Sequence, residues 1–217
     1  MKALGIIEVY SFSTAVCVAD AAAKAGGVEV IAFDRNRPGA NVKNAPAPLV
    51  MNIKVSGTVS DVKAAVEAGV AAAKARNKYI VSHVIPNPGE NMEKMAYLLD
   101  INKEKFNKKL PKSFLNYDGE LINQKTSAIG LLEVQGLVAT IEGLDTMLKT
   151  AAVRLIHTER RLGGGGLCTF VIEGSVDAVT ASVEAGCKSA SAIGKTFGCE
   201  VIAKPHEEVT KFFDFSE

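Results

Sequence analysis

Residues 3–9 read ALGIIEV, and residues 128–134 read AIGLLEV. A second pair of related stretches follows at GTVSDVKAAVEAG (57–69) and GSVDAVTASVEAG (174–186), which agree at more than half of their positions. Two unrelated stretches of average composition would agree at roughly one position in fifteen. Self-similarity of this extent indicates that the chain contains two copies of one domain.

The two copies differ in length at one place. The first pair of stretches sets a spacing that carries Asp20 and Lys24 onto Asp145 and Lys149. The second pair is eight residues closer together, so the first copy holds eight additional residues between positions 33 and 57. This difference predicts a loop that is longer in the first copy than in the second.

A polar stretch separates the copies. Residues 102–125 contain six lysines, few acidic residues and little periodicity, which is typical of a solvated connector. We predict a first domain at residues 1–100, a linker or inserted surface element at 101–125, and a second domain at 126–217.

Each copy shows the same order of predicted elements, βαββαβ. Apolar periodicity and glycine or proline breakers indicate an α+β fold in which helices flank a small antiparallel sheet. Gly69 and Gly186 occupy the same place in the longer helix of each copy, which predicts a close helix or backbone approach. The predicted strands are 3–9, 28–33, 49–55 and 79–85, then 128–134, 153–157, 168–172 and 200–203; the predicted helices are 13–25, 60–76 and 90–99, then 138–150, 177–197 and 207–213.

The charge balance excludes several classes of partner. The 217 residues include 25 Lys+Arg and 24 Asp+Glu, giving a net charge of +1, and the aromatic content is 6% with no Trp. Neither a nucleic-acid surface nor an acidic-membrane surface is expected from such a balance. The first apolar run is interrupted at Glu8, and no uncharged apolar run approaches the length of a membrane span. We therefore expect a cytoplasmic protein without nucleic-acid or membrane partners.

The reactive side chains form no catalytic or metal-binding motif. The four cysteines lack C-x-x-C spacing, which favours reduced, buried thiols over a disulfide framework or a zinc site. The three histidines are isolated from any H-E-x-x-H pattern and from any recognisable nucleophile. We expect no enzyme activity, no metal and no cofactor. The residues concerned are Cys17, Cys168, Cys187 and Cys199, with His83, His157 and His206.

Four motifs together carry a family resemblance. They are LGIIE (4–8), the Asp20-x-x-x-Lys24 helix end followed by Val28, the G-x-V-x-x-V helix start (57–62) and IPNP (85–88). The chain resembles the tandem shell proteins of bacterial microcompartments, most closely the unpermuted T-type subclass of propanediol utilisation. The resemblance implies a homotrimer that imitates a hexamer, tiles the shell with other shell proteins and surrounds a central pore.

The resemblance also implies residues at the edge of the tile, where neighbouring trimers meet. Lys24 and Lys149 match the edge lysine of the family, although a cation in the last turn of a helix is also favoured by the helix dipole. The corner that follows the last strand differs between the copies. The expected edge residues are Lys24, Lys149, Pro88, Pro205 and His206.

The loops after the second strand of each copy correspond to the pore loops of the family. The run of four glycines would allow backbones to approach a symmetry axis, while a flexible hairpin is the alternative. Small polar or anionic metabolites are the expected cargo, because the loops carry more cations than anions. No cysteine lies in residues 34–48, where some T-type relatives bind an iron–sulfur cluster. The expected pore residues are Arg35, Asn36, Arg37, Pro38, Gly39, Arg160, Arg161, Gly163, Gly164, Gly165 and Gly166.

A different class of function also fits a duplicated α+β domain. Such a protein could bind a small molecule between its two copies and act as a binding or regulatory protein. Hexagonal sheets of the purified protein would favour the shell, whereas a stable monomer that binds a metabolite would favour the alternative.

Overall fold

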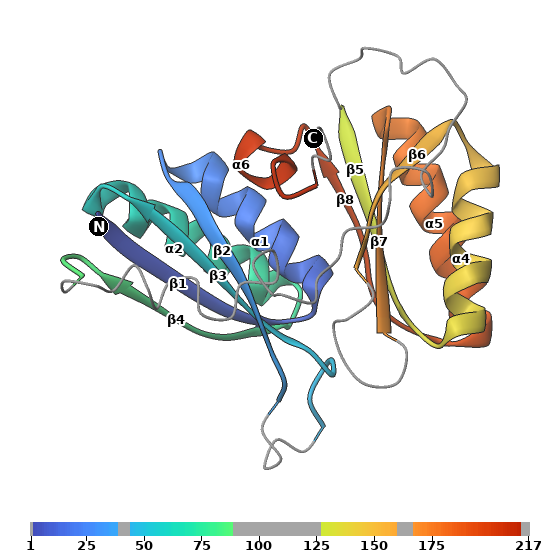
Figure 1. Ribbon diagram of the computed structural model, residues 1–217, viewed down its shortest axis with the longest axis horizontal. Helices are drawn as coiled ribbons and strands as arrows, with labels where there is room; N and C mark the ends of the chain where they lie inside the picture. Colours follow the sequence, from blue (N-terminus) through green and yellow to red (C-terminus); the bar gives the residue numbers. More distant parts are fainter. Residues whose placement is uncertain (1, 39–43, 89–126, 160–166, 214–217) are drawn as a thin grey trace. The chain divides into compact units, whose positions relative to one another are not determined.

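The computed structural model describes residues 2–38, 44–88, 127–159 and 167–213. The chain forms two compact units (Figure 1). The first unit comprises Met1–Asn107 together with His206–Phe212, and the second comprises Lys108–Pro205 together with Phe213–Glu217. The segment that follows the last strand of the second copy is therefore part of the first unit.

The described residues of the first unit form a four-stranded antiparallel sheet in the order β2-β3-β1-β4. Helices α1 and α2 pack against each other and against this sheet (Figure 1). The elements are β1 (Ala3–Tyr10), α1 (Phe12–Ala25), β2 (Glu29–Asn36), β3 (Val50–Gly57), α2 (Val59–Ala75), β4 (Tyr79–Ile85) and the short α6 (Glu207–Thr210).

The second unit repeats this topology. Its described residues form a four-stranded antiparallel sheet in the order β6-β7-β5-β8, with two helices packed on it. The elements are β5 (Ala128–Gln135), α4 (Leu137–Thr150), β6 (Val153–Glu159), β7 (Leu167–Gly174), α5 (Val176–Ile193) and β8 (Lys195–Ala203). The predicted tandem α+β fold of two βαββαβ copies is confirmed.

The longer helix of each copy begins at an equivalent capped turn. The Oγ1 of Thr58 accepts a hydrogen bond from the amide of Asp61 at 3.2 Å. In the second copy, the Oγ of Ser175 accepts from the amide of Ala178 at 3.3 Å. A hydroxyl at this position satisfies an amide that has no partner in the first helical turn. Each cap directly follows a glycine, Gly57 in the first copy and Gly174 in the second.

The helices approach the sheets and each other at glycines that both copies share. A Cβ at Gly69 would lie 2.5 Å from Ile7 Cδ1, and a Cβ at Gly186 would lie 2.3 Å from Met147 Cγ. The close approach predicted at these two helical glycines is confirmed. The strand glycine of LGIIE has the same role, because a Cβ at Gly5 would lie 2.7 Å from Val66 Cγ2.

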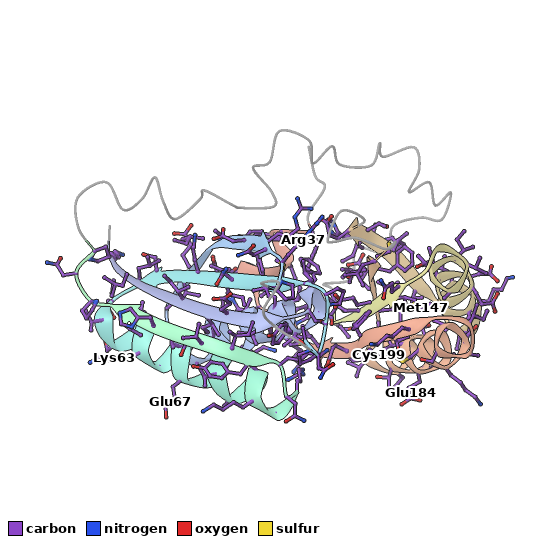
Figure 2. The ribbon with its side chains drawn as sticks, turned by 90° about the horizontal axis from the view of Figure 1, so that it is seen from below. Arg37, Lys63, Glu67, Met147, Glu184 and Cys199 are labelled. Carbon is purple, nitrogen blue, oxygen red and sulfur yellow. A yellow bond between two sulfur atoms is a disulfide. The ribbon has the colours of Figure 1, made fainter. Side chains whose placement is uncertain are left out.

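Two predictions about the second copy are wrong. The helix predicted over 177–197 ends at Ile193, and β8 begins at Lys195, earlier than the predicted residue 200. Cys187 on α5 and Cys199 on β8 form a disulfide with a Cα–Cα distance of 6.1 Å. Cys199 is labelled in Figure 2. Ending the helix at Gly194 turns the chain back along the sheet, which brings these two cysteines together. Cys17 and Cys168 are buried, as expected.

Candidate functional site

The expected edge lysines lie in the last turns of α1 and α4. Lys24 Nζ donates to Asp20 Oδ2 at 2.6 Å, and Lys149 Nζ donates to Asp145 Oδ2 at 2.6 Å. The hydrogen bond that Lys149 donates to Asp145 raises the pKa of Lys149, so this lysine stays charged. The Lys149 side chain is 74% exposed, against 41% for Lys24. The two copies therefore present the same acid–lysine pair at the same helix end.

The corner residue His206 meets the first of these pairs. Its backbone amide donates to Asp20 Oδ1 at 2.8 Å, while the other oxygen of this carboxylate holds Lys24. His206 also caps α6, because its Nδ1 accepts from the amide of Glu208 at 3.2 Å. One carboxylate thus links two of the expected edge residues. Pro88 and Pro205 are half-buried.

Sequence reasoning missed a third contact in this region. The carboxylate of Glu208 accepts a hydrogen bond at 2.7 Å from the backbone amide of Val30, on the edge strand β2. The sequence contains one signal for this region, the aspartate that recurs with a lysine at positions 20 and 145. The recurrence indicates a structural role for Asp20, but it does not show that residues 206–208 bind next to it.

The described part of the first expected pore loop begins within β2, which includes Arg35 and Asn36. Asn36 and Arg37 are exposed and Arg35 and Pro38 are half-buried. Arg37 is labelled in Figure 2, beyond the end of β2. The Oδ1 of Asn36 accepts a hydrogen bond from the amide of Arg37 at 2.8 Å. The remaining expected pore residues lie outside the described residues: Gly39, Arg160, Arg161, Gly163, Gly164, Gly165 and Gly166.

The carboxylates that precede the loops are held within the sheets. Asp34 Oδ2 lies 2.5 Å from Lys54 Nζ, and both side chains are nearly buried. Burial raises the pKa of Asp34, while the hydrogen bond and charge of Lys54 oppose this rise. In the second copy, Glu159 is buried with Oε2 at 3.8 Å from His157 Nε2. Both carboxylates thus belong to strands, Asp34 to β2 and Glu159 to β6.

Within residues 2–38, 44–88, 127–159 and 167–213, no three His, Cys, Asp or Glu side chains gather as ligands for a metal ion. None of the helices described there has the length and apolarity needed to cross a membrane.

A family model matches both copies. The BMC domain matches residues 3–88 and 128–205. A solved structure of a microcompartment protein from Desulfitobacterium hafniense is 24% identical, with 97% of this chain and 99% of that chain covered and a TM-score of 0.38.

Curated relatives match the chain in two ways. The carboxysome assembly protein CcmO of Synechococcus elongatus is 32% identical over 207 residues, which cover 95% of this chain and 67% of the relative. The CcmO of Synechocystis is 28% identical, and the match covers 96% of this chain and 63% of the relative. The shell protein EutM of Salmonella typhimurium is 40% identical over 89 residues, which are 41% of this chain and 91% of EutM. The chain belongs to the BMC domain family and is a structural protein of the bacterial microcompartment shell.

Proposed function

We propose that three copies of the chain close into a ring of six BMC domains, a homotrimer with pseudo-sixfold symmetry. Two matching domains per chain provide six similar corners when three chains form a ring. The observation that carries the proposal is the helix-end pair, Asp20–Lys24 and Asp145–Lys149, which the two copies present in the same geometry. Equivalent contacts at all six corners require such equivalence between the copies.

The ring would act as a tile beside other microcompartment shell proteins and would have no catalytic role. Flat packing of such tiles depends on contacts between their outer edges, where the resemblance places Lys24 and Lys149. Both lysines project from helix ends and keep exposed side chains, so each is accessible to a neighbouring tile.

Replacing Lys24 and Lys149 together with alanine is expected to impair sheet formation and to leave the trimer intact. Sedimentation velocity measures the trimer, and electron microscopy of the purified protein measures the sheets. The matched control replaces Lys63 on α2 and Lys188 on α5, which are also exposed lysines on helices (Lys63 is labelled in Figure 2). Sheets that form equally well in both double variants would reject the edge assignment, and a strict monomer at micromolar concentration would reject the ring.

We also propose that the loops after β2 and β6 surround a pore for small polar or anionic metabolites. Arg35, Arg37, Arg160 and Arg161 contribute four cations per chain. Three chains would place these cations around one axis, and a positive potential in a narrow aqueous channel favours anions.

Changing these four arginines to serine is expected to remove the preference of the pore for anions. Ion passage through bilayers that carry the protein would report this preference as a reversal potential under a salt gradient. A control variant with Lys63 and Lys188 changed to serine keeps the loops intact and should retain the parent preference. An unchanged preference in the arginine variant would show that the loops do not set selectivity.

A further inference from the structure

Residues 206–212, here called the C-terminal clasp, bind the helix end and edge strand of the first unit. The backbone amide of His206 donates a hydrogen bond to Asp20, and the carboxylate of Glu208 accepts one from the backbone amide of Val30. The ring of Phe212 lies edge-on to that of Phe33, with centroids 4.8 Å apart. Val209, in the middle of the clasp, is fully buried. This segment comes from the end of the second copy, so the contact joins one copy to the other in sequence.

The second unit offers the same receiving surface. Asp145 on α4 stands where Asp20 stands on α1, and both carboxylates hold a lysine four residues later. Strand β6 has a register shift after Leu155, as β2 has after Val30. Both strands lie at the edge of their sheet, where backbone amides can bind an additional segment.

The two receiving helices differ sharply in exposure. In the first unit, Ser13 and Val16 on α1 are fully buried. The residues at the same places on α4 are Val138 and Ile141, which are 69% and 60% exposed. Two large apolar side chains on one helix face indicate a surface that another element covers. Within the described residues of one chain, these two side chains stay exposed.

The sequence contains a second clasp. The spacing that carries Pro88 onto Pro205 carries GENMEKM (89–95) onto HEEVTKF (206–212). Met92 then replaces the buried Val209, and Met95 replaces Phe212, so the apolar positions are kept. Asn91 replaces Glu208, and its side-chain oxygen can also accept a hydrogen bond from a backbone amide.

We propose that residues 89–95 of one chain bind the face formed by α4 and β6 of a second copy of the chain. This proposal rests on the proposed trimer and names the contact that closes it. The C-terminal clasp runs from the second copy to the first. Repeating that direction sends residues 89–95 to the second copy of the next chain, which is a head-to-tail contact that can close a ring. If residues 89–95 bound α4 of their own chain, the two copies of that chain would hold each other and no neighbouring chain would be joined.

One contact of the C-terminal clasp is not repeated. Lys211 Nζ lies 3.9 Å from Glu29 Oε1, whereas the residue equivalent to Glu29 is Arg154, which is paired with Glu173 on β7. The second interface therefore keeps the carboxylate, the amide and the apolar contacts of the first, without this exposed ion pair. Exposed pairs contribute little to binding.

The experiment places one cysteine on each side of the proposed contact in the full chain. Met95→Cys and Thr158→Cys replace the residues equivalent to Phe212 and Phe33, and a short bismaleimide links thiols that lie close together. Denaturing gels and peptide mass spectrometry then distinguish links between chains from links within one chain. Each single variant serves as a control for the native cysteines, of which Cys17 and Cys168 are buried.

Covalent dimers and trimers linked through positions 95 and 158 are the expected result. A protein that sediments as a trimer but links only within a chain, or not at all, would overturn the clasp and leave the trimer standing. A strict monomer would overturn both. Asp145→Lys provides an independent measurement and should raise the dissociation constant of the trimer by about tenfold or more, because it removes a charged acceptor. Glu184→Lys, on the exposed side of α5 (Figure 2), should leave that constant unchanged.

Discussion

Lys54→Met is expected to lower the free energy of unfolding of the first unit by about 3–5 kcal/mol at neutral pH, because it leaves a buried carboxylate without its cation. Asp34 Oδ2 lies 2.5 Å from Lys54 Nζ, and the two side chains are 5% and 10% exposed. The other carboxylate oxygen, Oδ1, accepts no hydrogen bond from the described residues. Urea denaturation followed by far-ultraviolet circular dichroism would measure the loss.

The double variant Asp34→Asn/Lys54→Met is the control for this effect. It keeps the shape of the pair and removes both charges, which is often nearly neutral for a buried ion pair. We therefore expect the double variant to recover most of the lost stability. A double variant as unstable as Lys54→Met would show that the lysine stabilises the sheet by packing alone.

The loss should also depend on pH. Burial already raises the pKa of Asp34, and removing Lys54 removes the interactions that oppose this rise. Between the ordinary aspartate value and the raised pKa, the folded state binds more protons than the unfolded state, so stability falls as pH rises through this window. The deficit of Lys54→Met should therefore be small near pH 4 and fully present at pH 8. An equal deficit at both pH values would contradict the assignment to Asp34.

The duplication made the fold predictable from sequence, because each helix and strand could be predicted separately in each copy and the two predictions compared. The ion pair was not predictable in the same way. Asp34 pairs with Asn52 across β2 and β3, and Lys54 stands two residues further along the same face. Such diagonal neighbours interact, but their identity depends on the register of the two strands. The longer loop of the first copy hides that register in the sequence.

The disulfide was missed for a related reason. A helix continuing to residue 197 would keep Cys187 and Cys199 on separate, diverging elements. The structure ends α5 at Ile193 and starts β8 at Lys195, so the chain reverses between the two cysteines. Helix ends are set by tertiary contacts as well as by local preference. A difference of a few residues at one boundary therefore changed the interpretation of two cysteines.

The residues expected at the tile edge could be named from the sequence, but the side chain that joins two of them could not. The family resemblance pointed to Lys24 and His206 separately, as residues of a helix end and of a corner. The structure joins them through Asp20, across a sequence separation that no local pattern can report. The same limitation applies to residues 89–95, whose proposed binding surface follows from the contacts of the C-terminal clasp.

Gly186→Ala is expected to lower the free energy of unfolding of the second unit by about 3 kcal/mol, at the upper end of the usual cost of overpacking. The added Cβ would lie 2.3 Å from Met147 Cγ and 2.9 Å from the backbone oxygen of Gly143. Met147 is fully buried (labelled in Figure 2), and Gly143 belongs to the backbone of α4. Relief of both contacts requires α4 and α5 to move apart. Urea denaturation measures the loss, and hydrogen exchange of α4 and α5 peptides assigns it to this helix pair.

Gly69→Ala in the first copy is the matched control. There the nearest atom to the added Cβ is the end of the Ile7 side chain at 2.5 Å, and the next is Val18 Cγ1 at 3.2 Å. A side-chain end can rotate away, and alanine gains about 1 kcal/mol over glycine inside a helix. We therefore expect Gly69→Ala to cost about 1 kcal/mol or less. Equal losses in the free energy of unfolding for the two variants would contradict this explanation. They would show that the backbone of α4 moves away from Gly186 as easily as a side chain does, and so does not fix the distance between the helices.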